Sequence, residues 1–112
     1  MIHNDTEASL SSVSIVVTTF NRVNLLSETI GSILGQTYTD FELIIVDNMS
    51  EDGTKEYVVG IADSRIRYYK NANNGVIAVN RNFGIQQSMG KYIALCDDDD
   101  LWLSDKLQCQ VD

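Results

Sequence analysis

The sequence predicts an α/β fold in which helices flank a mostly parallel sheet. Four short apolar segments alternate along the chain with segments whose apolar residues recur at helical spacing. Such alternation implies parallel strands joined by right-handed crossovers. The length of 112 residues and the apolar fraction of 44% fit one domain with a modest core, and no internal repeat or low-complexity linker interrupts it.

The first elements follow a polar lead. Residues 1–12 are expected to be flexible, and the domain is expected to occupy residues 13–112. Residues 13–20 are apolar and β-branched, which predicts a buried strand. Asn24 is expected to cap a helix that ends near residues 35–37. The apolar residues of this helix share one face: Leu25, Leu26, Ile30, Ile33 and Leu34.

The middle of the chain repeats the pattern. Residues 41–47 read as a second buried strand, and a turn-rich loop follows. Residues 50–62 suit a short helix, and residues 65–69 form a third, more alternating strand. Glycine, asparagine and aspartate must make the turns, because the chain has no proline.

The last third begins with a helix. Its predicted face comprises Val76, Val79 and Phe83, with Gly90 as the glycine that ends it. Residues 91–96 form the fourth strand, and residues 102–111 begin another helix. The resulting β-α-β-α-β-α-β-α order is Rossmann-like.

Polar, irregular segments follow each predicted strand. They comprise residues 18–22, 47–52, 71–75 and 97–100. In open parallel sheets, ligands bind beyond the carboxyl ends of the strands. The sequence therefore predicts a ligand site at this edge.

Composition excludes several classes of protein. Sixteen acidic against eight basic residues give a net charge of −8, which argues against nucleic acid as the partner. No apolar run approaches the roughly 18 residues of a membrane span. The lead lacks the apolar core of a signal peptide, so we expect a cytoplasmic protein with free thiols. Two cysteines and one histidine argue against a Cys/His zinc site.

Four of the acids form one acid run: Asp97, Asp98, Asp99 and Asp100. Two carboxylates about 5 Å apart repel by roughly 3 kcal/mol at an effective dielectric near 20. A divalent cation relieves this repulsion, and all-oxygen ligands suit Mg²⁺, Mn²⁺ or Ca²⁺. The alternative is a solvated acidic turn. A helix-loop-helix calcium loop does not fit, because Trp102 stands where that loop needs glycine.

The chain resembles the N-terminal, nucleotide-binding part of a family 2 glycosyltransferase with the GT-A fold. Four segments carry the resemblance, in order and at fitting spacing: VSIVVTTFNR, LLSETIGSILGQTYTDFELIIVDNMSEDGT, SRIRYYKNANNGVIAVNRNFGI and GKYIALCDDDDLWLSDKL. It implies transfer of a sugar from a nucleotide donor, commonly UDP-linked, to an acceptor hydroxyl with inversion.

The resemblance also implies a nucleoside site. Phe20 stands where the family has a stacking tyrosine, beside Asn21 of the same turn. Thr18 and Thr19 would present backbone and hydroxyl groups. Two further residues stand where the family often has two aspartates, one of which accepts a hydrogen bond from the uracil imide; they are Asp47 and Asn48. Uracil is favoured as the base, with thymine as an alternative. The alternative role for Asp47 is a carboxylate that caps the turn.

The remaining assignments concern the diphosphate. Gly75 would let the loop pass close to the nucleotide, and Arg81 would bind a diphosphate oxygen or pair with an acid as an exposed helix residue. Asp98 would face the ribose or metal-bound water. Asp97 and Asp99 would bind Mn²⁺ or Mg²⁺.

Three neighbouring residues are expected to have structural roles. Asp100 is expected to cap the helix that starts near Trp102. Core or rim packing is favoured over a sugar platform for Trp102. Cys96 is expected to be a small buried residue.

The family's general base lies downstream, in the acceptor half. We therefore expect a chain truncated at its C-terminus that binds the donor, a UDP-sugar, and transfers nothing by itself. The whole enzyme would act on a saccharide or lipid-linked acceptor at the cytoplasmic face of the membrane, in surface polysaccharide or glycoconjugate synthesis. The oligomeric state stays open.

Two alternatives belong to other classes. A phosphorelay receiver domain would have similar size and magnesium-binding acids, but needs an acidic pair where Thr18 and Thr19 stand. It also needs an aspartate where Lys70 and Asn71 follow the third strand. The second alternative is a non-catalytic module whose acidic face binds a basic partner.

Overall fold

The computed structural model describes residues 2–3 and 13–111. The lead predicted at residues 1–12 therefore lies outside the described residues, apart from Ile2–His3. These two residues form β1, which pairs antiparallel with β5.

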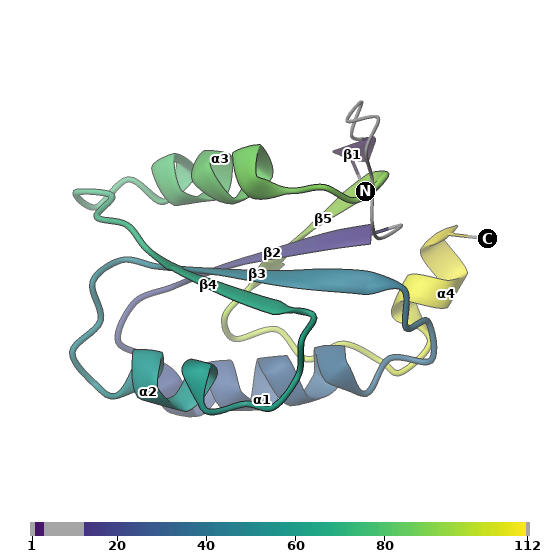
Figure 1. The fold of residues 1–112 in the computed structure, drawn as a ribbon, viewed down its shortest axis with the longest axis horizontal. Helices are drawn as coiled ribbons and strands as arrows, with labels where there is room; N and C mark the ends of the chain where they lie inside the picture. Colours follow the sequence, from purple (N-terminus) through teal and green to yellow (C-terminus); the bar gives the residue numbers. More distant parts are fainter. Residues whose placement is uncertain (1, 4–12, 112) are drawn as a thin grey trace.

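A five-stranded sheet in the order β1-β5-β2-β3-β4 forms the centre of the molecule (Figure 1). Every pairing among the last four of these strands is parallel. The predicted α/β fold with a mostly parallel, Rossmann-like sheet is thus confirmed. The bounds are Val13–Thr19 for β2, Phe41–Asp47 for β3, Ile66–Lys70 for β4 and Tyr92–Asp97 for β5.

Helices cover both faces of the sheet. Figure 1 shows α1 and α2 on one face and α3 on the other, with α4 beside the opposite end of the sheet from the β3–α2 loop. The bounds are Val23–Leu34 for α1, Thr54–Val59 for α2, Ile77–Gln87 for α3 and Lys106–Val111 for α4. Among the described residues, no helix is long and apolar enough to cross a membrane.

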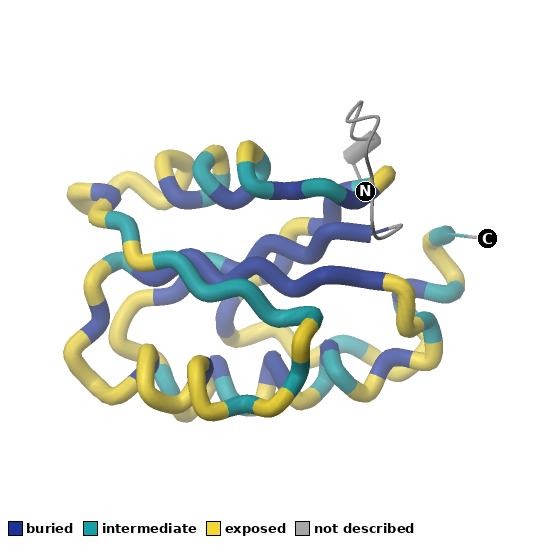
Figure 2. The backbone as a smooth tube through the Cα atoms, viewed as in Figure 1, coloured by how far each residue is buried: buried dark blue, intermediate teal, exposed yellow. Residues whose placement is uncertain are grey.

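The core consists of two apolar layers on the two faces of β2 and β3. Odd-numbered residues of both strands, such as Ile15 and Leu43, pack with Leu26 and Ile30 of α1. Even-numbered residues, such as Val16, pack toward α3. Burial on both faces explains the continuous apolar runs in sequence, and Figure 2 shows these strands as the most buried part of the chain.

The start of α1 differs from the prediction. The helix begins at Val23, so Asn24 lies inside its first turn and does not cap it. Asp52, from the loop after β3, accepts a hydrogen bond from the Val23 backbone N–H at 2.9 Å. This carboxylate satisfies one of the N–H groups that a helix leaves free at its N-terminus. The predicted apolar face is confirmed for Leu26, Ile30 and Ile33.

The face predicted for α3 is confirmed for Phe83, which packs against the apolar layer on this side of the sheet, and is wrong for the two valines. Val76 and Val79 are exposed, whereas Asn80 and Gly84 are buried against the sheet. A methyl group at Gly84 would overlap the side chain of Val16, so this helix lies close to the sheet because its contact residue has no side chain.

Gly90 does not end α3, which stops at Gln87. A Cβ on Gly90 would lie 2.6 Å from the Ser14 backbone nitrogen, so Gly90 permits close backbone packing. The helix predicted at residues 50–62 is shorter, and the one predicted from residue 102 begins at Lys106. Asp100 therefore does not cap it.

Candidate functional site

A pocket of about 450 Å³ opens at the carboxyl ends of the parallel strands. Its lining comes from the last residues of β2 and β5 and from the segments that follow β2, β3, β4 and β5, as the topology argument predicts, together with the first turns of α3. The described residues that line it are Thr18, Thr19, Phe20, Arg22, Asn48, Asn73, Gly75, Ile77, Arg81, Asp97, Asp98 and Asp99. Nine of the eleven residues expected at the site are in this set; Asn21 and Asp47 are not.

Asp47 lies behind the pocket and is fully buried. One of its oxygens accepts hydrogen bonds from the backbone N–H and the hydroxyl of Ser50, at 3.1 and 2.5 Å. The other accepts from the Tyr68 hydroxyl at 2.5 Å. Burial, and then the hydrogen bond to Asp47, raise the pKa of Tyr68 above its ordinary value. The geometry makes Asp47 a turn residue that holds the loop carrying Asn48.

Asn21 joins two loops beside the pocket. Its backbone has a left-handed φ of 49°, which asparagine tolerates better than most residues. Its backbone N–H donates to the Ser50 hydroxyl at 2.8 Å, and its side-chain oxygen accepts from the Glu51 backbone N–H at 2.8 Å. These bonds fix the turn that presents Phe20, a residue that lines the pocket and is 51% exposed.

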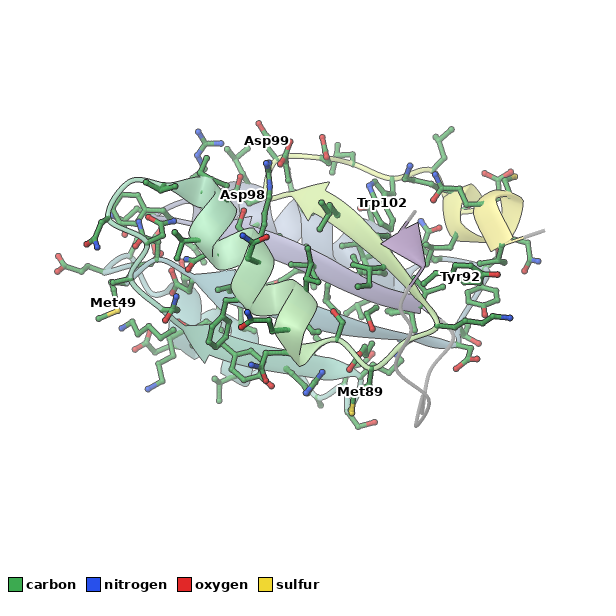
Figure 3. The ribbon with its side chains drawn as sticks, turned by 90° about the horizontal axis from the view of Figure 1, so that it is seen from above. Met49, Met89, Tyr92, Asp98, Asp99 and Trp102 are labelled. Atoms are coloured by element: carbon green, nitrogen blue, oxygen red, sulfur yellow. The ribbon has the colours of Figure 1, made fainter. Side chains whose placement is uncertain are left out.

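Within the acid run, Asp98 is the member turned toward the protein. It is 8% exposed, and its carboxylate accepts from the Thr19 hydroxyl at 3.0 Å and from the Arg22 guanidinium at 3.3 Å. Its backbone oxygen accepts from the Thr29 hydroxyl of α1 at 2.9 Å. Figure 3 shows Asp98 and Asp99 at the carboxyl end of β5, beside α3.

The other three carboxylates are exposed and converge. Asp97, Asp99 and Asp100 each offer an oxygen within 4.8 Å of the others. A turn produces this arrangement: the Asp100 N–H donates to the Asp97 backbone oxygen at 3.2 Å, and the Asp97 N–H donates to the Asp100 carboxylate at 3.1 Å. A set of carboxylate oxygens fits a hard divalent cation such as Mg²⁺ or Mn²⁺. Asp100 thus joins the expected pair as a third candidate ligand.

Two arginines lie next to these acids. The Arg81 guanidinium of α3 lies 3.1 Å from the Asp97 carboxylate. Arg81 therefore lines the pocket and also forms an exposed ion pair, which was the alternative role considered for it from the sequence. Arg22 lies 3.3 Å from Asp98 and 3.6 Å from Asp99. Sequence reasoning assigned Arg22 no role, although it ends one of the polar segments predicted at this edge. The pocket therefore places two guanidinium groups beside the carboxylates of the acid run.

Asparagine side chains order the loop between β4 and α3. The Asn71 amide donates to the Asn80 side-chain oxygen at 2.8 Å, and the Asn80 amide donates back to the Asn71 backbone oxygen at 2.8 Å. This reciprocal pair accounts for the buried asparagine on α3. It brings Gly75, with a φ of 81°, to the pocket. Asn73 and Ile77 are lining residues that sequence reasoning missed, since nothing in the pattern separates them from their loop and helix neighbours.

The groups flanking the acid run are structural. The Cys96 thiol is buried, and burial together with the charges of Asp100 and Asp97 raises its pKa to about 12. A protonated thiol is neither a nucleophile nor a good metal ligand. Trp102 packs against the main core cluster, as its sequence position favoured, and its backbone N–H donates to the Ser32 hydroxyl at 3.1 Å.

Solved structures share this fold. S. aureus TarS 1-349 in complex with UDP aligns with a TM-score of 0.84 at 24% identity, covering 89% of this chain and 31% of that one. A mannosyltransferase from Pyrobaculum calidifontis in complex with GDP-Man and Mn²⁺ aligns with a TM-score of 0.80 at 24% identity, covering 98% and 34%.

Sequence relatives are more similar. An uncharacterized glycosyltransferase of Rickettsia felis is 42% identical over 100 residues, covering 88% of this chain and 16% of the relative. The Escherichia coli UDP-Glc:alpha-D-GlcNAc-diphosphoundecaprenol beta-1,3-glucosyltransferase WfgD is 36% identical over 99 residues, covering 88% and 39%. This chain spans well under half the length of either relative. The sequence model of Glycosyl transferase family 2 matches residues 14–112, so the chain belongs to that family.

Proposed function

We propose that this chain binds the nucleotide-sugar donor of a glycosyltransferase, a UDP-sugar held with Mn²⁺ or Mg²⁺. One observation carries the proposal: a single pocket combines an exposed aromatic ring, two guanidinium groups and a cluster of carboxylates. These groups match, in turn, a base, a diphosphate and a divalent cation. The name of the Escherichia coli relative, which includes UDP-Glc, favours uracil as the base.

Each part of the donor has a candidate partner. The exposed face of Phe20 offers a surface for the base, and Thr18 and Thr19 border it. Arg81 presents a planar guanidinium that suits bidentate contact with a diphosphate oxygen. Asp97 and Asp99, with Asp100, would hold the cation. When bound, that cation neutralises charge on the departing nucleotide diphosphate.

The aspartates of the acid run have two kinds of role, one in the fold and one in ligand binding. Asp98 is fixed by Thr19 and Arg22, so it holds the β2 turn against the end of β5. Its neighbours on either side are exposed and available to a cation. We assign Asp98 a place beside the ribose or metal-bound water, because it lines the pocket while held in this way.

The whole enzyme would transfer the sugar with inversion to a hydroxyl of a saccharide or lipid-linked acceptor. In this proposal, residues 13–112 form the donor-binding part, and the general base lies in a segment outside this chain. The greater length of the relatives supports it. The relative named for a diphosphoundecaprenol substrate supports action at the cytoplasmic face of the membrane, in surface polysaccharide or glycoconjugate synthesis.

Calorimetric titration of the chain with UDP, with and without Mn²⁺, tests donor binding. We expect binding that needs the cation and that Asp99→Asn weakens at least tenfold. Asp40→Asn is the matched control, because Asp40 is also exposed but lies outside the pocket. Failure of the folded wild type to bind UDP, or equal binding by the Asp99 variant, contradicts the proposal. Sugar transfer by the isolated chain would contradict the assignment of the base to another segment.

A further inference from the structure

Two asparagine amides at the pocket have a fixed orientation. The backbone N–H of Asn73 donates to the Asn48 side-chain oxygen at 3.0 Å. The backbone N–H of Gly75 donates to the Asn73 side-chain oxygen at 2.9 Å. A backbone N–H can only donate, so the atom facing it in each side chain must be the oxygen. Both carbonyl oxygens are thus engaged by the loop itself.

The NH₂ groups of these amides are left for a ligand. Asn48 and Asn73 both line the pocket, and neither NH₂ group has a hydrogen-bond partner among residues 2–3 and 13–111. Asn73 is only 6% exposed, so its amide is held close to the pocket wall. An amide NH₂ donates and cannot accept. This part of the pocket therefore offers hydrogen-bond donors.

We propose that Asn48 and Asn73 form a donor pair that reads hydrogen-bond acceptors on a pyrimidine base. The inference rests on the proposed donor site and adds which feature of the base is recognised. Uracil offers two carbonyl oxygens and an N3–H donor, whereas cytosine offers one carbonyl oxygen, an N3 acceptor and an exocyclic NH₂ donor. A carboxylate at position 48 would accept from the uracil N3–H and repel the cytosine N3. An amide NH₂ group can instead donate to the C2 carbonyl oxygen, which both bases carry, so the pocket accepts cytosine as well as uracil nucleotides.

The test compares the dissociation constants of UDP and CDP, measured by calorimetry with Mn²⁺ present. For the wild type we expect values within about threefold of each other. Asn48→Asp keeps one oxygen for the Asn73 N–H and replaces the NH₂ group by a second oxygen. We expect it to favour UDP over CDP at least tenfold, a difference of about 1.4 kcal/mol.

Two further variants control this experiment. Asn74→Asp adds the same charge to the β4–α3 loop next to Asn73, at a residue that does not line the pocket and whose φ of 52° aspartate tolerates. It should weaken both nucleotides alike and leave their ratio unchanged. Asn73→Asp makes the same exchange of atoms at the second amide and should also favour UDP. It serves as the test should Asn48→Asp fail to fold.

The outcomes separate the inference from the proposed function. A wild type whose dissociation constants for UDP and CDP differ by clearly more than threefold overturns the inference and leaves donor binding intact. Equal UDP-to-CDP ratios for Asn48→Asp and Asn74→Asp overturn the inference in the same way. A folded wild type that binds neither nucleotide overturns both.

Discussion

The acid run should contain one aspartate needed by the fold and one that the metal-free fold can lose. Asp98 is 8% exposed and engages Thr19 and Arg22, whereas the Asp99 side chain is 53% exposed and forms its one ion pair among the described residues with Arg22, at 3.6 Å. Alanine at each position removes the same charge from the same segment. The pair of variants therefore separates structural contacts from charge.

The expected magnitudes follow from these contacts. In Asp98→Ala, the Thr19 hydroxyl, in a residue 4% exposed, loses its acceptor, which costs about 1–3 kcal/mol. The lost ion pair adds at most about 1 kcal/mol, because the Arg22 side chain is 52% exposed. In Asp99→Ala, loss of the long contact to Arg22 is offset by relief of repulsion, about 1 kcal/mol for a nearby exposed charge. The variants should differ by about 2 kcal/mol.

Thermal unfolding without divalent cations measures this difference. For a domain of this size, about 2 kcal/mol corresponds to a lowering of Tm by roughly 8–16 °C for Asp98→Ala, with Asp99→Ala within a few degrees of the wild type. Addition of Mn²⁺ should then raise the Tm of the wild type more than that of Asp99→Ala. Equal destabilisation by the two variants would refute the separation of roles.

Four further predictions concern packing, buried charge and the thiols in the rest of the fold. Gly84→Ala should lower the free energy of unfolding by about 1–3 kcal/mol in urea, because the added methyl overlaps Val16; an unchanged midpoint would show that α3 can shift freely. Glu42→Ala should cost about 2–4 kcal/mol in the same assay, because Glu42 holds a partly buried arginine and two other donors; a loss under 1 kcal/mol would contradict this. In the native protein at pH 8.5, iodoacetamide should label exposed Cys109 before Cys96. Since burial raises the pKa of Cys96 from 9.0 to about 12, stability should fall as pH rises above 9; a Tm that falls equally steeply in Cys96→Ala would contradict it.

The strands were predictable because strands buried on both faces need apolar residues, and these appear as apolar runs in the sequence. The central strands β2 and β3 are covered on both faces, so each contains an unbroken apolar run in its middle, and their predicted bounds are within a residue of the observed ones. The receiver alternative is wrong, since the chain belongs to another family. A two-residue antiparallel strand such as Ile2–His3 is too short to show any periodicity.

The errors arose where a contact comes from a distant part of the chain. Asp52 satisfies the start of α1 from the loop after β3, so the local residue Asn24 is not needed as a cap. The fully buried contacts of the α3 helix with the sheet are Asn80 and Gly84, which an apolar pattern cannot reveal, although Phe83 of the same helix also packs there. Gly84 has no side chain, so the helix can lie close to the sheet at this contact. Asn80 can be buried because Asn71 satisfies the hydrogen bonds of its side-chain amide.

The site shows the same limit at the level of single atoms. Strand order alone brings the four polar segments to one edge, so most lining residues could be named from sequence. The sequence could not show whether Asn48 offers an acceptor or a donor to a ligand, because its side-chain oxygen is engaged by the backbone of a loop 25 residues away. The same residue type would present an acceptor had that loop folded differently. In the proposed site, specificity for the base would therefore depend on the fold of the β4–α3 loop as much as on the residue at position 48, and substitutions at Asn73 should alter it although Asn48 is unchanged.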